Sequence, residues 1–351
     1  MLHAHSAGAQ VLHGQDYWLP VLWSGIAAFT ILAYIVLDGF DLGIGLLFAA
    51  EYRPDDRNVM VNTVAPVWDG NETWLILGGA ALYGVFPVAY ATVLPALYPP
   101  IIAMLLALIF RGVAFEFRFK ALSQRGRFLW DLAFFGGSLV AGLAQGLTLG
   151  GLIQGIKVVD DAYAGGWWDW LTPFSVLCGV GVVTGYALLG SCWLVWRTDG
   201  PLQARCRRHS RTLGLCTLAL IVAVSLWTPT LQGHYLRHWY VWPRILFVSP
   251  VPILVAALAV LFWRGLARED VHITPLLCAL GWFFLCFTGL GISVWPYIVP
   301  PGITIWDASS PPSSQYFLLV GAGVLIPTIL AYTIYSYWVF RGKIGVETHY
   351  H

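Results

Sequence analysis

The spacing of apolar and polar residues predicts a chain that crosses a membrane many times. A helix needs about 20 mostly apolar residues to span the hydrocarbon of a bilayer, and runs of this kind alternate along the chain with short segments that hold most of the charges. The expected spans lie at residues 19–48, 73–92, 93–115, 129–155, 171–196, 212–231, 247–264, 276–297 and 315–340.

The division between the second and third runs is the least distinct. Prolines at positions 87 and 95 mark either the boundary between two spans or a break within one long span, which would leave eight spans instead of nine. Lys and Arg favour nine, because basic loop residues concentrate on the cytoplasmic side. With the N-terminus outside and the C-terminus inside, that side holds Arg53, Arg57, Arg118, Lys120, Arg125, Arg127, Arg197, Arg205, Arg207, Arg208, Arg211, Arg264, Arg268, Arg341 and Lys343, and the other side holds Lys157, Arg237 and Arg244.

Composition supports an all-α polytopic membrane protein. Charged residues make up 11% of the chain, whereas a soluble domain carries about 25%. A net charge of +1 gives no electrostatic reason to expect a nucleic-acid partner. The N-terminus lacks the basic start of a cleavable signal peptide. We expect one integral-membrane domain over 1–351, with residues 1–18 outside, 19–340 in the membrane and 341–351 as a cytoplasmic tail.

The residues that ligate metals lie in unfavourable places for a metal centre. The nine histidines fall in predicted loops, tails or helix edges, whereas a membrane haem needs axial His or Met from a helix. Met104 is the one methionine in mid-span, and packing explains it. His234 and His238 stand four apart in a predicted outward loop, where solvation is favoured over metal binding. The six cysteines form no C-x-x-C pair and are expected to be buried and inert. The chain itself is therefore expected to bind neither haem nor another metal.

Ionisable residues near the cytoplasmic side of the first three spans, within them or at their ends, are the candidate functional groups. A charge inside a membrane is costly, and it usually faces the protein interior or a water path. Residues three apart on a helix share a face, so Asp38 and Asp41 are expected on one face of the first helix, and Asp69 and Glu72 on one face of the second. The set comprises Asp38 and Asp41 in DGFD, Asp69 and Glu72 in WDGNETW, and Arg111 and Glu116 in FRGVAFE.

Two interpretations of these charges stay open. In the structural one, Asp38 or Asp41 pairs with Arg111 and locks the helices together, while Asp69 or Asn71 caps the second span. In the functional one, Asp69 takes protons from the cytoplasm and passes them inward along polar groups. The sequence alone favours the structural interpretation, although the two can hold for different residues. The DGFD pair suits the structural role better, while Asp69 lies at the mouth of a span and suits proton entry.

The loop before the last span also carries an acidic residue. Asp307 lies in WDASSPPSS, where turns built by Asp and Ser side chains are common. Such a turn explains the motif, and a contact with a partner subunit is the alternative.

Three motifs together resemble the second subunit of cytochrome bd ubiquinol oxidases. They are YIVLDGFDLGIGLL, TVAPVWDGNETWLI and FRGVAFEFR, and WDASS and YSYWVFRGKI near the C-terminus resemble the same family. The likeness is strongest over residues 34–120. The short segments between spans resemble the cyanide-insensitive branch of the family.

The resemblance implies a subunit of an enzyme in the bacterial cytoplasmic membrane that oxidises ubiquinol and reduces dioxygen to water. The partner, subunit I, would carry two haems b and haem d and oxidise the quinol. This chain would carry no haem and would fold as two four-helix bundles plus a peripheral helix, surrounded by lipid. A small single-span subunit and a structurally bound quinone are implied for some members.

The resemblance also assigns roles to individual residues. Asp69 matches an aspartate regarded as a proton entry point, and Trp74 matches a tryptophan near a proposed route for dioxygen. Glu72 is placed beside Asp69 on the proton pathway, although Glu72 and Glu116 fall where some members have an amide or an aspartate. The other motif residues matched are Trp68, Asn71, Asp38, Asp41 and Asp307.

The main alternative is a secondary transporter that uses the acidic cluster as its ion or substrate site. Such a protein would have broken helices at the bilayer midplane and inverted halves. Residues 87–100 offer one break, with no counterpart in the second half of the chain. A membrane scaffold is the third class, and a haem spectrum of the purified protein would separate the three.

Overall fold

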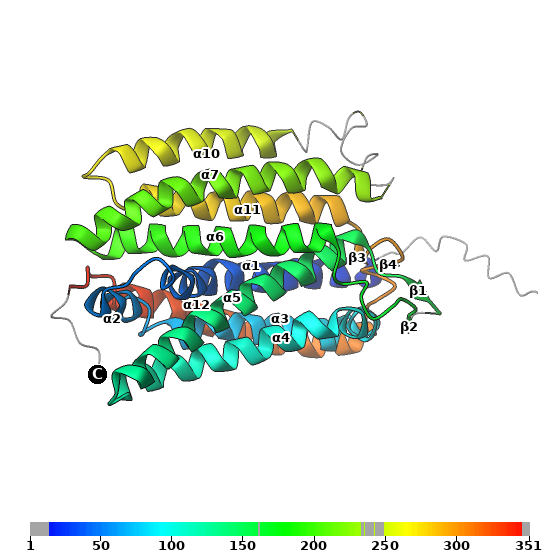
Figure 1. Ribbon diagram of the computed structural model, residues 1–351. Coiled ribbons are helices and arrows are strands. Elements are labelled where there is room, and N and C mark those ends of the chain that lie inside the picture. Colours follow the sequence, from blue (N-terminus) through cyan, green and yellow to red (C-terminus); the bar gives the residue numbers. More distant parts are fainter. Residues whose placement is uncertain (1–13, 161, 233–234, 236–241, 243–248, 346–351) are drawn as a thin grey trace, which may run out of the picture.

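The computed structural model describes residues 14–160, 162–232, 235, 242 and 249–345, which form long helices lying side by side (Figure 1). Two short antiparallel hairpins lie between helices: β1 (Val158–Val159) with β2 (Ala162–Tyr163), and β3 (Tyr297–Val299) with β4 (Ile303–Thr304). The helices in this part of the chain are α1 (Gln15–Leu47), α2 (Pro54–Asn62), α3 (Trp68–Val85), α4 (Pro87–Lys120), α5 (Gln124–Gln154), α6 (Pro173–Arg197), α7 (Gly200–Leu231), α10 (Pro250–Ala267), α11 (Thr274–Val294) and α12 (Pro312–Val339).

Eight of these described helices are long and apolar enough to cross a membrane, which confirms a polytopic all-α membrane protein. The other two are α2, with nine residues, and α3, with 18 residues. At 1.5 Å per residue, α3 is about 27 Å long. It is not among the eight, and its first two turns carry Asp69 and Glu72.

The predicted boundary between residues 92 and 93 is wrong. The second run ends at Val85, and Phe86 separates α3 from α4. Pro87 suits the first turn of α4 because a proline there loses no helical hydrogen bond. The later prolines of α4 bend the helix without ending it, since each removes one backbone bond within a run held by its neighbours. The kink is at Leu97 (φ −118°, ψ 15°).

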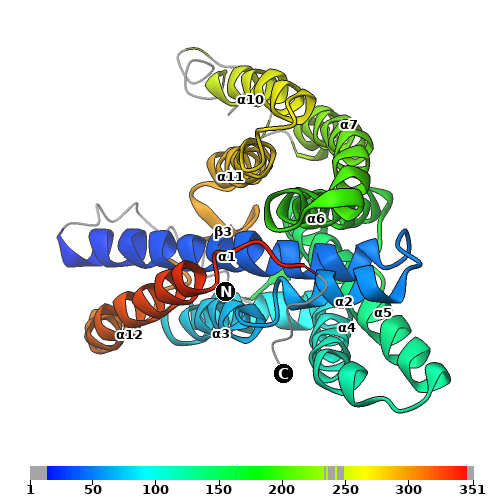
Figure 2. The same ribbon diagram turned by 90° about the vertical axis from the view of Figure 1, so that its left-hand side faces the viewer.

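Helix α1 lies in the middle of the molecule (Figure 2). It packs against α3, α5 and α6, and it also touches α11 and α12. On one side α3 contacts α4 and α12, and α4 packs along α5. On the other side α6 packs along α7 and α11, and α10 packs along α11. This central position makes α1 the helix that carries the DGFD pair into the interior.

Glycines allow α1 and α6 to approach backbone to backbone. A Cβ atom added at Gly43 would lie 1.9 Å from the carbonyl oxygen of Tyr186, and one added at Gly190 would lie 2.5 Å from the carbonyl carbon of Gly43. Small residues of this kind let membrane helices pack closely. The close approach buries the C-terminal part of α1, including Asp38 and Asp41.

We expect Gly43→Ala to destabilise the protein by about 1–3 kcal/mol, because the added methyl group meets backbone atoms that can move only if the two helices separate. Thermal unfolding of the purified protein in detergent measures the effect. Gly25→Ala on the same helix is the matched control, since a Cβ there meets nothing within 4 Å. Equal melting temperatures for the two variants would contradict this account of the packing.

The loops rich in basic residues meet at one end of the bundle, on the left of Figure 1. Arg205 of α7 binds Glu51 in the loop between α1 and α2 (2.9 Å), and Lys343 after α12 binds Asp199 between α6 and α7 (2.5 Å). The guanidinium of Arg207 donates to carbonyls of the α10–α11 loop. We call this the arginine-rich end. These contacts agree with the predicted clustering of basic residues on one side.

Candidate functional site

A buried ion pair joins α1 to α4. Arg111 Nη1 lies 2.6 Å from Asp38 Oδ1, and neither side chain is accessible to solvent. Arg111 Nη2 lies 3.3 Å from Glu72 Oε1 on α3, whose side chain is 27% exposed. The sequence left open which aspartate pairs with Arg111, and the structure assigns Asp38. Helices α1, α3 and α4 thus each contribute one charged group to the same cluster.

Asp41 lies one helical turn from Asp38 and has a different partner. The Asn71 amide donates to Asp41 Oδ2 (2.8 Å) and to the carbonyl oxygen of Leu37 (3.2 Å), while the Tyr337 hydroxyl donates to Asn71 Oδ1 (3.1 Å). The tyrosine hydroxyl therefore orients the amide so that its N–H groups face α1. Asp41 is fully buried and makes no ion pair among the described residues.

The prediction that Asp69 or Asn71 caps the second span is wrong. The N-cap of α3 is Val67, without a capping side chain, because the helix begins at Trp68. Asp69 falls in the first turn, where the helix dipole favours a carboxylate. Its side chain is exposed at the arginine-rich end, since only a short turn separates α2 from α3. Asp69 is thus at a mouth, as expected, and Glu72 lies one turn farther in.

A string of polar groups that we did not predict continues inward from Asp38. The Tyr186 hydroxyl donates to Gln145 Oε1 (2.5 Å), and Gln145 Nε2 donates to the hydroxyl oxygen of Tyr34 (2.8 Å). Tyr34 lies one turn before Asp38, so the two side chains share a face of α1. That i,i+4 spacing was the available signal for Tyr34. Nothing local pointed to Gln145 or Tyr186, which come from α5 and α6.

Two tryptophans of the WDGNETW motif lie on either side of these charges. Trp68 stacks on Phe115 (ring centroids 5.2 Å apart), and the Arg111 guanidinium lies 6.0 Å from its ring centroid, within range of a cation–π contact. Trp74 is completely buried, with its ring edge-on to Phe29 (5.6 Å). Trp68 therefore covers the ion pair, while Trp74 packs deeper against α1.

Two predicted residues are not part of the cluster. Glu116 is exposed on α4 and makes no ion pair with any residue that the structure describes, so its expected role as a structural intramembrane charge finds no support. The reason is its position on α4, five residues after Arg111, which turns it to another face. Asp307 accepts hydrogen bonds from the Thr304 backbone N–H (3.2 Å) and hydroxyl (2.6 Å), the turn that the sequence indicated.

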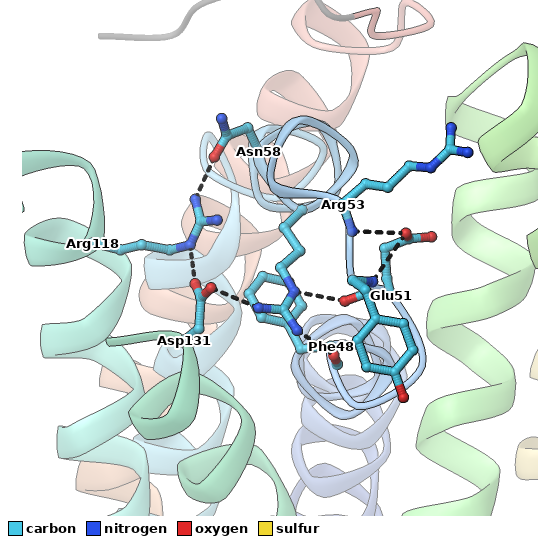
Figure 3. A network of polar contacts seen from close by, with 8 residues as sticks. Phe48, Glu51, Arg53, Asn58, Arg118 and Asp131 are labelled. Atoms are coloured by element: carbon cyan, nitrogen blue, oxygen red, sulfur yellow. Dashed lines mark hydrogen bonds and ion pairs between the residues drawn. The ribbon is translucent and has the colours of Figure 1, made fainter. Parts of the chain in front are cut away.

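A second charged network, which the sequence did not lead us to expect, lies at the arginine-rich end (Figure 3). Asp131 on α5 lies 2.8 Å from Arg57 of α2 and 2.5 Å from Arg118 of α4. Arg118 also donates to Asn58 Oδ1 (2.6 Å), and Arg57 donates to the carbonyl oxygen of Phe48 (2.8 Å). One carboxylate therefore connects α2, α4 and α5. An acidic residue just inside a predicted span was the signal for Asp131.

The residues that ligate metals give no centre in the described part of the chain. No group of three or more His, Cys, Asp or Glu residues there is arranged to hold a metal ion. His234 and His238 lie outside the described residues. All six cysteines are free thiols, but the expectation that they are buried fails at Cys216 on α7, which is exposed, and at Cys286 on α11, which is partly exposed.

Comparison with known proteins identifies the family. The family described as "Cytochrome bd terminal oxidase subunit II" matches residues 19–340. The chain belongs to this family. "Cytochrome bd-I ubiquinol oxidase subunit 2" of Escherichia coli (strain K12) is 30% identical, over 94% of this chain and 96% of that protein. "Cytochrome bd ubiquinol oxidase subunit 2" of Bacillus subtilis (strain 168) is 29% identical, over 92% and 96% respectively.

A solved structure is similar in fold. The bd oxidase from Geobacillus thermodenitrificans contains a chain that matches with a TM-score of 0.75 at 18% identity, over 92% of this chain and 99% of that one. The resemblance drawn from the motifs is therefore confirmed, and the chain is a subunit of a cytochrome bd terminal oxidase. The secondary transporter and the membrane scaffold are set aside, because the family match spans nearly all of the predicted membrane region.

Proposed function

We propose that this chain is the haem-free subunit of a ubiquinol-oxidising bd oxidase in the bacterial cytoplasmic membrane, and that its acidic cluster admits protons to the complex. The partner subunit I would hold two haems b and haem d, oxidise ubiquinol and reduce dioxygen to water. One observation carries the proton role: charged and polar groups follow one another from exposed Asp69, through half-buried Glu72, to fully buried Arg111, Asp38 and Asp41.

A polar route of this kind has a physical purpose in the complex. Reducing dioxygen to water consumes protons, and a proton cannot cross hydrocarbon without polar groups to receive it. Asp69 and Glu72 are the accessible carboxylates of the cluster, so they are the groups that can exchange protons with water. Arg111, 2.6 Å from Asp38 and 3.3 Å from Glu72, connects α4 to α1 and α3 around that entry.

The proposed topology places the entry in the cytoplasm. We count α3 as a ninth crossing, which puts the N-terminus outside and the arginine-rich end inside, in accord with the preference of basic loops for the cytoplasm. One four-helix bundle would comprise α1, α3, α4 and α5, and the other α6, α7, α10 and α11. The peripheral helix would be α12, which is the least buried of the eight apolar helices.

The remaining family roles stay predictions. Trp74 was placed near a route for dioxygen, and its complete burial against Phe29 gives that role no further support. A bound structural quinone, a small single-span third subunit and cyanide insensitivity rest on the family resemblance alone.

Asp69→Asn is expected to slow quinol-driven oxygen uptake by the purified complex while the haem spectrum stays unchanged. Losing a proton-transfer group typically costs about 10²–10⁴ in rate, but Glu72 remains beside the mouth, so the single variant should retain part of its activity. The double variant Asp69→Asn/Glu72→Gln removes both accessible carboxylates and should be slower than either single variant.

Glu116→Gln is the matched control, because this carboxylate lies at the same end of the molecule but outside the cluster. Wild-type turnover in the double variant would remove the cluster from the proton route. A loss of haem signal in Asp69→Asn would instead indicate a structural role for this residue.

A further inference from the structure

The buried cluster holds more negative than positive groups. Asp38, Asp41 and Glu72 contribute three carboxyls, and Arg111 is the only cation that contacts them among the described residues. Full ionisation would leave two unbalanced negative charges, and two carboxylates that share a buried site do not both ionise readily. Glu72 is partly exposed, so water screens its charge. We therefore expect only one of the two buried aspartates, Asp38 and Asp41, to be ionised.

The contacts of the two aspartates are unequal. Asp38 has the guanidinium of Arg111 at 2.6 Å. The other oxygen of Asp38, Oδ2, is buried without a hydrogen-bond partner among the described residues, as is Oδ1 of Asp41. The guanidinium therefore distinguishes the two aspartates, because a cation in contact with a carboxylate favours its charged form. Asp38 is the member of the pair whose negative charge has a cation to balance it.

Asp41 has no comparable partner. The charged and titratable groups near it are Asp38 on α1, Glu72 on α3, Arg111 on α4 and the Tyr337 hydroxyl on α12. The one hydrogen bond to Asp41 is that of the neutral Asn71 amide, and Asp41 Oδ1 is buried without a hydrogen-bond partner among the described residues. One neutral amide donor offsets the cost of a buried carboxylate much less than a guanidinium does, and a buried anion without a cation is costly.

We propose that Asp41 holds a proton inside the cluster, while Asp38 is the anion paired with Arg111. This inference rests on the proposed proton entry and names the group that the entering proton reaches. The site is loaded after Glu72 takes a proton from water: the O–H bond of the Glu72 carboxylic acid then breaks, an O–H bond forms on the Asp41 carboxylate, and Asp41 keeps the proton. No electron moves, and the total charge of the cluster is unchanged.

Infrared spectroscopy of the purified complex at neutral pH tests the protonation state. A protonated carboxylic acid has a carbonyl stretch separate from that of carboxylates, and the band shifts in heavy water. We expect one such band to be present in the wild type, in Glu116→Gln and in Asp69→Asn, and to be missing from Asp41→Asn. A spectrum of Asp41→Asn that keeps every carboxylic-acid band of the wild type would overturn the proposal.

Assembly provides an independent measurement. Asparagine is close to a neutral isostere of a protonated aspartic acid, so Asp41→Asn should assemble with the haem content of the wild type. Asp38→Asn leaves the Arg111 guanidinium buried without its anion and should lose most of the assembled complex. Equal losses in the two variants would mean that Asp41 is ionised. Sodium-dependent stability of the wild type, abolished in Asp41→Asn, would mean that a bound cation and not a proton balances the charge.

The two proposals can fail separately. If Asp69 and Glu72 variants keep full turnover while the infrared band depends on Asp41, the proposed proton entry is wrong, but the proposal that Asp41 is protonated is supported. If the Asp69 variants are slow and Asp41→Asn keeps the band, the entry stands and the assignment of the proton to Asp41 is wrong.

Discussion

Replacing Arg111 with methionine is expected to abolish assembly of the oxidase or to destabilise it by about 3–5 kcal/mol, the usual cost of removing one partner of a buried ion pair. The change leaves Asp38 fully buried without its cation and removes the contact with Glu72 at 3.3 Å. Trp68 also loses the guanidinium near its ring. The yield of haem-bearing complex and its melting temperature in detergent measure the effect.

Two variants make the Arg111 experiment decisive. Arg111→Lys keeps the charge but cannot reach Asp38 and Glu72 with two separate nitrogens, so it should fall between the wild type and Arg111→Met. Arg268→Met is the control, because the Arg268 side chain is exposed at the arginine-rich end. Wild-type stability of Arg111→Met would show that the ion pair does not hold α1, α3 and α4 together.

Replacing Asp131 with leucine is expected to produce the second largest loss of stability, again about 3–5 kcal/mol. Arg118 is 1% exposed and would keep a buried charge whose carboxylate is gone, and Arg57 would lose its anchor to α5. The loop between α1 and α2, which the Arg57 guanidinium also binds through the carbonyl of Phe48, should become more mobile. Thermal unfolding and proteolysis within this loop are the measurements.

A compensating change tests the physical reason. If the cost of Asp131→Leu comes from an uncompensated charge at Arg118, then Arg118→Met in the same chain should restore part of the lost stability, because an apolar pair replaces a buried ion pair at little cost. A double variant less stable than Asp131→Leu would mean that Arg118 contributes chiefly through packing and its bond to Asn58.

Most of the membrane architecture could be predicted from the sequence, because a long apolar run has few alternatives to a membrane-spanning helix. The boundary at Phe86 could not. Prolines at 87, 95, 99 and 100 are locally equivalent as helix breakers, and only packing in three dimensions decides that Pro87 starts a helix while the others lie within it.

Most charged residues of the candidate site could be predicted from the sequence, but which of them contact one another could not. Charges inside apolar runs identified Asp38, Asp41 and Arg111, since the membrane makes such residues rare, and the WDGNETW motif at the start of the second run identified Glu72. The choice of Asp38 over Asp41 as the partner of Arg111 depends on how α1 and α4 are rotated, which no local pattern encodes. Gln145 could not be predicted for the same reason, because it is part of the site only through its hydrogen bonds with Tyr34 and Tyr186 on other helices.

The central claim is that the mouth of the acidic cluster opens to the cytoplasm. Labelling of a cysteine at position 69 with a membrane-impermeant maleimide tests it, in a Cys216→Ser background that removes the exposed native thiol. Asp307→Cys, exposed in the turn before α12, is the control for the opposite end. We predict that Asp69→Cys reacts in inverted vesicles and not in intact spheroplasts, while Asp307→Cys does the reverse. Reaction of Asp69→Cys in spheroplasts would contradict the account.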